Sequence, residues 1–340
     1  MRNSRLNLEH ITCALTGEPL RTELLDENSM LYKMLGDAGV VYAGLAVLVL
    51  GTVQVQTIKG LKDHEPIFQK QTNTSEADKK KAQAQRLQES SELLGGIIYG
   101  VSEQDKADAA FALRELHRKI RGHLADGSRY HAWEPQVWAH AWAGIFKGII
   151  DAYAVFRGFD TPEHRDEALL GFIEFGKVFG VKGIPDNWLE FDIYWQDFIS
   201  TAVIDETVCQ IASVVRNGYF QENLLERLRS GEWRAALKLI ASLPKLRFAR
   251  VGAMATFPLQ FDQQLGIKRT LFDRIEGKIH QLIWRCVPKS WSSKLGPNSF
   301  KKRAERGHIP IWRKRLSREN LQITKNQIRE QREQEIATGG

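Results

Sequence analysis

The stretch from residue 102 to residue 123, SEQDKADAAFALRELHRKIRGH, decides the fold class, because its apolar residues have the spacing of a helix. Ser102 followed three residues later by Asp105 resembles a capping box with Asp in place of Glu, which predicts a helix start. From Ala110 to Leu124 the residues at intervals of three and four form one largely apolar face. We therefore expect a helix from residue 102 to about residue 123.

The segments on either side continue the helical pattern. Residues 75–99 are rich in strong helix formers. The ADGS sequence at 125–128 predicts a turn, and Pro135 suits the first turn of a helix that runs to about Phe156. Further helices are expected at 161–180, 185–198, 205–216, 221–228, 233–243 and 270–286, and only 247–257 hints at extended structure.

A chain of helices without alternating strands predicts an all-α fold. We expect an N-terminal extension over residues 1–30, one multi-helix domain over 31–295, and a basic C-terminal tail over 296–340 that is helical or disordered. The 340 residues are 43% hydrophobic, which is enough for a sizeable core. The three cysteines are scattered, so neither a disulfide framework nor a thiolate zinc site is indicated.

The net charge of +7 is concentrated in the tail, where residues 301–340 hold eleven Lys and Arg against five acidic residues. Mixed charges favour a solvated extension, with contact to anionic lipid as the alternative. Specific nucleic-acid binding is not expected.

The most apolar segment, AGVVYAGLAVLVLGTV at 38–53, is shorter than the roughly 20 residues that span a bilayer, and it contains three glycines. We expect a buried core helix there, with a membrane-dipping helix as the alternative. The N-terminus has no continuous apolar run typical of a secretory signal, which favours a cytoplasmic location, with membrane association as the alternative.

The common catalytic motifs are absent from the sequence: it contains no GxGxxG, no GxxxxGK[ST], no HExxH and no GxSxG. What remains is a concentration of histidines between residues 117 and 140. His117 lies on the apolar helix face, with Arg114 one turn earlier and Arg121 one turn later. It is either a hydrogen-bonded core histidine or a metal ligand, since nearby arginines would keep the ring neutral. The arginines themselves need anions, and the propionates of a haem would serve.

The next helix carries small residues, including Gly144, in the sequence VWAHAWAGIFKG at 137–148. Small residues let either a planar macrocycle or another helix approach closely. His140 is a distal polar group, a second ligand or a core histidine. The tryptophans here, Trp138 among them, are expected to build the core more than to stack a substrate.

These residues resemble a known family, the catalytic domain shared by latex clearing protein (rubber oxygenase) and the ER-bound oxygenase of the mycophenolic acid pathway. The resemblance covers residues 31–288 and rests on the order and spacing of several motifs. The first motif, R-x-x-H-x-x-x-R-G, is read at residues 114–122, and later matches are at Asp126, Gly127, Tyr130, Pro135, Trp138 and His140.

The resemblance implies an all-α fold that holds one haem b, with His117 as the iron ligand and Arg114 and Arg121 beside the haem. Trp138, His140 and Gly144 become candidate walls of the haem pocket. Upstream, Arg86 and Ser90 match a family arginine followed four residues later by a threonine, and Glu89 aligns with a lysine that can reach the iron. The implied reaction cleaves a C=C bond of an isoprenoid or another apolar substrate with O2.

Two alternatives stay open from the sequence. One is a haem peroxidase, peroxygenase or oxidase that acts on a small molecule or a peptide. The other is a non-enzymatic helical protein that binds membranes peripherally and whose histidines are structural.

Overall fold

Helices make up nearly all of the regular structure in the computed structural model, which describes residue 12, residues 15–65 and 76–292, and eight single positions between 298 and 313. Side chains of most residues between 76 and 87 lie outside that description. The α-helices are α2 (Met30–Gly36), α3 (Gly44–Leu50), α4 (Val55–His64), α5 (Glu76–Tyr99), α6 (Glu103–Arg118), α7 (Pro135–Phe156), α8 (Pro162–Lys177), α9 (Trp188–Ser200), α10 (Glu206–Ala212), α11 (Tyr219–Arg229), α12 (Trp233–Thr256), α13 (Leu271–Cys286) and α14 (Lys289–Ser292).

Short elements complete the described chain: four 3-10 helices, η1 (Thr22–Leu24), η2 (Ala38–Ala43), η3 (Ser213–Val215) and η4 (Leu259–Phe261), and a hairpin of strands β1 (Arg121–His123) and β2 (Arg129–His131). The all-α prediction is confirmed.

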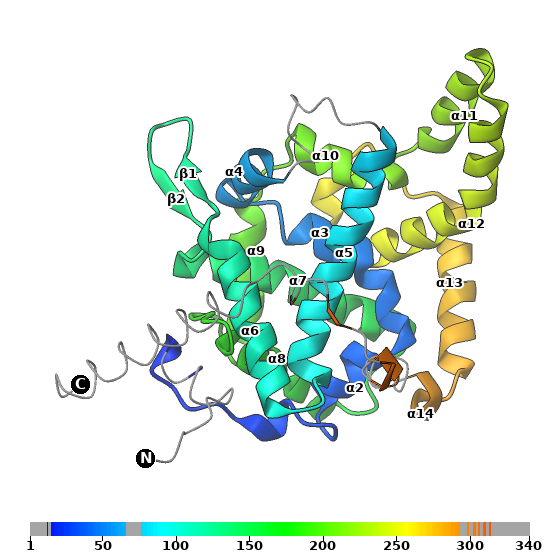
Figure 1. Cartoon of the computed structure of the whole chain (residues 1–340). Coiled ribbons are helices and arrows are strands. Elements are labelled where there is room, and N and C mark those ends of the chain that lie inside the picture. The colour runs from blue at the N-terminus through cyan, green and yellow to red at the C-terminus, as the bar shows by residue number, and fades with distance from the viewer. Residues whose placement is uncertain are drawn as a thin grey trace.

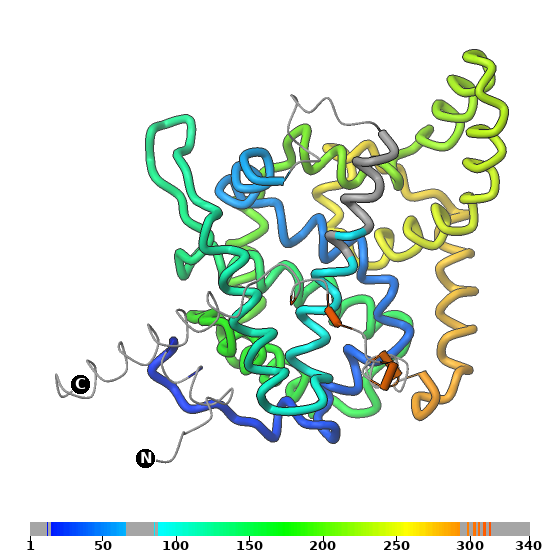
Figure 2. The backbone as a smooth tube through the Cα atoms, in the orientation of Figure 1, coloured from blue at the N-terminus to red at the C-terminus, as the bar shows by residue number. Residues whose placement is uncertain are grey.

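Helix α7 runs through the centre of the molecule and packs against α3, α8, α12 and α13 (Figure 1). Its buried Phe146 and Phe156 belong to a core that also includes Phe172 and Phe191 from neighbouring helices. Helices α5 and α6 form a helical hairpin across this core; α6 and the second half of α5 are the cyan to blue-green segments of the tube view (Figure 2). The candidate site lies at one end of this hairpin.

Local capping signals set most helix starts where the sequence predicts them. The side chain of Ser102 accepts a hydrogen bond from the backbone N–H of Asp105, and Thr161 caps α8 in the same way. Thr270 and Asp273 form a complete capping box at α13. Helix α7 begins at Pro135 and ends at Phe156, which confirms the predicted bounds.

Two predictions about helix extent are wrong. Helix α6 ends at Arg118, because the chain then turns into the β1–β2 hairpin, where the N–H of Ala132 donates to the carbonyl of Ile120. In the second case residues 247–257 are not extended, because α12 continues through Pro244 to Thr256. Its second half is held by packing, with Gly252 so close to Tyr42 that a Cβ would lie 2.3 Å from the Tyr42 carbonyl oxygen.

The apolar segment 38–53 forms η2 and α3, and only three of its residues, Val41, Gly44 and Leu48, are exposed. Among the described residues no single helix is long and apolar enough to cross a membrane. The pair Met30–Gly36 and Ala38–Leu50, which is bent by 70°, reaches the length and composition that a broken span would need.

Candidate functional site

His117 lies in the last turn of α6, half-buried, with its ring tilted against the indole of Trp138 at a centroid distance of 4.9 Å. Its Nδ1 is 2.8 Å from the carbonyl oxygen of Leu113. A carbonyl only accepts, so this contact places the ring proton on Nδ1 and the lone pair on Nε2. This is one of the arrangements found in metal-binding histidines, in which a second-shell carbonyl fixes the tautomer.

Arg114, one turn before His117, is held without a salt bridge among the described residues. Its guanidinium donates to the carbonyl oxygen of Phe179 at 3.1 Å and lies 4.4 Å from the ring centre of Trp133. Burial lowers the pKa of Arg114 to about 10, partly opposed by the neighbouring charge of Glu115. A desolvated cation beside the histidine face suits the carboxylate of a bound group.

Trp138 adds a buried donor next to His117. The side chain is 8% exposed, and its Nε1 has no hydrogen-bond partner among the described residues. The indole also contacts the ring of Phe179 at 5.8 Å. His117, Arg114 and Trp138 thus share one surface between α6, α7 and the end of α8.

Helix α5 carries three further predicted site residues, Arg86, Glu89 and Ser90, at about the height of His117 along α6. Gly96 of α5 faces Ala109 of α6, where a Cβ on Gly96 would lie 3.2 Å from the alanine Cβ. Both helices rise by about 1.5 Å per residue. His117 lies eight residues after Ala109, on the side away from the turn between α5 and α6. It is therefore level with the part of α5 that lies about eight residues before Gly96, which contains Glu89 and Ser90.

Glu89 is fully buried there, which is unusual for a carboxylate, and Ser90 is half-buried. The side chain of Arg86 lies outside the described part of the chain.

Arg121 does not flank His117 on a helix, contrary to the sequence prediction. Because α6 ends at Arg118, the four-residue spacing no longer places the two side chains on one face. Arg121 begins β1, pairs with His131 across the hairpin and is exposed.

His140 and Gly144 also lie away from His117, although both are on α7. Two residues turn a helix by about 200°, so His140 lies almost opposite Trp138. The His140 ring contacts Phe198 of α9 at 5.6 Å, and burial lowers its pKa, while Asp197 acts in the opposite direction. Gly144 faces α3, where a Cβ would lie 2.2 Å from the carbonyl oxygen of Leu50. The geometry of Gly144 therefore favours the helix-packing reading of the small residues.

Sequence reasoning missed Phe179, because a backbone carbonyl that holds an arginine leaves no side-chain signature.

The described residues contain no group of three or more His, Cys, Asp and Glu side chains able to hold a metal ion. With ligands from the described residues alone, a metal at His117 would need most of its coordination from a cofactor. A cavity of about 260 Å³ lies at a different place, lined by Thr16, Arg21 and Lys177 among others.

The family model described as "ER-bound oxygenase mpaB/B'/Rubber oxygenase, catalytic domain" matches residues 32–287. Neither the curated proteins nor the solved structures contain a significant match.

Proposed function

The chain belongs to the family of the ER-bound oxygenases mpaB and mpaB' and of rubber oxygenase, through their catalytic domain, and on that premise we propose that it is a haem b-dependent oxygenase for an apolar substrate. Membership makes it an oxidoreductase of the oxygenase class. The haem, its protein ligand and the substrate class are proposals that go beyond family membership.

The observation that carries this proposal is the hydrogen bond between His117 and the carbonyl of Leu113. It keeps the proton on Nδ1 and leaves Nε2 as the nitrogen that would hold the iron. Arg114 would pair with a carboxylate of the haem, and the Trp138 ring would form the wall beside the ligand. These contacts support a haem that has a single protein ligand.

When bound, the haem supplies the redox-active iron for O2 chemistry. The chain's own part is to orient the ligand, to exclude water and to place the substrate. Glu89 and Ser90 would form the wall on α5, and Glu89 would be an acidic group where the family resemblance implies a lysine. In the proposed net reaction, O2 adds one oxygen atom to each carbon of a C=C bond and gives two carbonyl groups.

A visible spectrum of the purified protein, with and without added haem, tests the proposal. The wild type should show a Soret band, and His117→Ala should lose most of it because the iron loses its protein ligand. Addition of imidazole should restore part of the band. His131→Ala is the matched control, since His131 lies in β2 and bonds the carbonyl of Arg118.

Full haem retention by His117→Ala would show that another residue is the ligand. Absence of any Soret band after reconstitution would overturn the haem function as a whole. Product analysis with O2 and with H2O2 then separates an oxygenase from a peroxidase or peroxygenase. Turnover of apolar alkenes with peroxide alone would contradict the oxygenase assignment.

A further inference from the structure

Helix α13 turns its apolar residues to solvent. Six large apolar side chains recur along it at the spacing of one helical stripe, and each is more than half exposed. They are Leu271 (72%), Phe272 (61%), Ile275 (51%), Ile279 (52%), Leu282 (67%) and Ile283 (55%). An apolar stripe of this length on a protein surface marks an interaction site.

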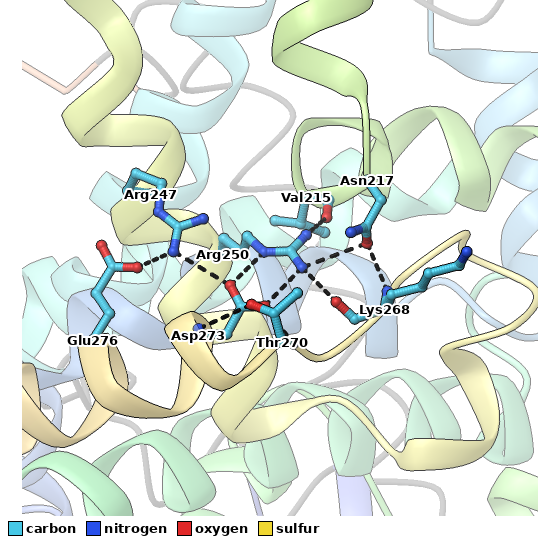
Figure 3. A network of polar contacts seen from close by, with 8 residues as sticks. All are labelled: Val215, Asn217, Arg247, Arg250, Lys268, Thr270, Asp273 and Glu276. Carbon is cyan, nitrogen blue, oxygen red and sulfur yellow. Dashed lines mark hydrogen bonds and ion pairs between the residues drawn. The ribbon is translucent and has the colours of Figure 1, made fainter.

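The opposite face of α13 is held against the body by polar groups. Arg250 of α12 donates to both oxygens of the Asp273 carboxylate, at 2.7 and 2.9 Å, and Arg247 bridges Asp273 and Glu276 (Figure 3). Further along, Nδ1 of His280 lies 2.7 Å from the hydroxyl of Tyr42. These contacts fix the rotation of α13, so the apolar stripe cannot turn inward without breaking them.

A second apolar stripe continues from the first. At intervals of three and four residues, α12 exposes Trp233 (65%), Leu237 (64%), Ile240 (47%) and Leu243 (37%). Arg247, one turn after Leu243, stacks on the ring of Phe272 at 4.8 Å and so joins the two stripes. The first half of α12 and α13 lie along the same edge of the molecule, at the right of Figure 1. We call these two stripes together the α12–α13 face.

The exposed charged residues of these two helices are basic. Helix α12 contains no acidic residue, and the acids of α13 are Asp273, which is buried, and Glu276, which is paired with Arg247. The basic residues Arg234, Lys238, Lys245, Arg274, Lys278 and Arg285 are exposed. Apolar side chains bordered by Lys and Arg form the pattern of helices that lie in an anionic lipid interface.

From this complementarity we propose that the α12–α13 face lies on the surface of a bilayer that contains anionic lipid. The apolar stripes enter the boundary between headgroups and acyl chains, and the basic residues contact the headgroups. Two copies of the chain would bring like charges together if they paired through this face. The chain's own tail over residues 301–340 is also basic, so it does not complement the face either.

Vesicle flotation of the full chain tests this proposal. The probes are vesicles of phosphatidylcholine alone and vesicles that also contain phosphatidylserine. The wild type should float only with the second kind. The double substitution Ile279→Glu and Leu282→Glu should lower the partition coefficient at least about tenfold, because two exposed apolar groups become anionic. Circular dichroism verifies that this variant stays folded.

Helix α9 provides the matched control, since Leu189 (76%) and Ile193 (65%) are also exposed there. All the charged residues of α9 are acidic and exposed, namely Glu190, Asp192 and Asp197. Leu189→Glu with Ile193→Glu should therefore leave flotation unchanged. Lys278→Gln should weaken binding about fivefold, and high salt should act in the same direction.

Three outcomes would overturn the proposal. The first is a wild type that does not float with anionic vesicles. The second is equal flotation of the Ile279→Glu, Leu282→Glu variant, which would assign binding to the tail, since the tail is intact in every variant. The third is a wild-type dimer in sedimentation that the same substitutions dissociate, which would assign the face to a second copy. None of these results depends on haem content.

Discussion

Two buried tryptophans on α7 differ in what their indole nitrogens meet. Nε1 of Trp142 donates to the carbonyl of Phe172 at 3.0 Å, while Nε1 of Trp138 has no partner among the described residues. We expect Trp142→Phe to lower the free energy of unfolding by about 1 kcal/mol more than Trp138→Phe, because only Trp142 loses a buried hydrogen bond. Urea denaturation of the haem-free protein measures both, and equal losses would contradict this account.

Helix α7 packs on α3 through a glycine, which gives a prediction for that helix pair. A Cβ at Gly144 would collide with the carbonyl of Leu50, so Gly144→Ala should destabilise the protein by about 3 kcal/mol. Gly277→Ala in α13 is the control, because its added Cβ would meet no atom of another element within 4 Å. An alanine there should raise stability by about 0.5–1 kcal/mol. Thermal unfolding distinguishes the two, and a neutral Gly144→Ala would show that α3 and α7 do not approach as described.

Helix boundaries were predictable from sequence where a local signal sets them. Pro135 and the cap at Ser102 act within one helical turn, so α7 and the start of α6 follow from a few neighbouring residues. After α6 the chain turns into the β1–β2 hairpin, and Tyr130 of β2 makes a distant contact there by donating to Asp63 of α4 at 2.7 Å. Such contacts have no sequence signature, so the two strands were not predicted, although the turn between them at 125–128 was.

The candidate site was likewise predictable only where neighbouring residues of one helix determine it. The three-residue spacing places Arg114 and His117 on adjacent turns of one helix, and the structure keeps them together. The predicted position of Arg121 beside His117 depended on α6 continuing past Arg118. To place His140 correctly, one would have to know which face of α7 meets α6. Both depend on tertiary packing, which periodicity alone does not give.

The network around Asp273 makes the stability of the whole molecule depend on pH, because it joins α12, α13 and the η3 segment (Figure 3). Hydrogen bonds from Arg250 and Thr270, with the arginine charge, overcome the effect of burial and hold the pKa of Asp273 well below its usual range. The ionised carboxylate therefore contributes stability that is complete above the pKa of the unfolded chain, near 4, and is lost as the pH falls through the lowered pKa.

Asp273→Asn should consequently cost about 3 kcal/mol at pH 7, since it leaves buried Arg250 without its counter-charge. The difference from the wild type should shrink as the pH falls below about 4. Chemical denaturation at a series of pH values measures it, with Asp160→Asn as a control whose ion pair with Lys289 is exposed. A difference that does not change between pH 7 and pH 2 would contradict this linkage.

The guanidinium of Arg157 joins segments that lie far apart in the sequence. Its side chain is 1% exposed and bonds Asp37 near one end of the described chain, and the carbonyl of Val287 and the hydroxyl of Ser292 near the other. The family match ends at residue 287. A fragment cut at that boundary would lose the Ser292 hydroxyl as an acceptor for this buried cation, so we expect it to be less stable than a fragment that ends after Ser292.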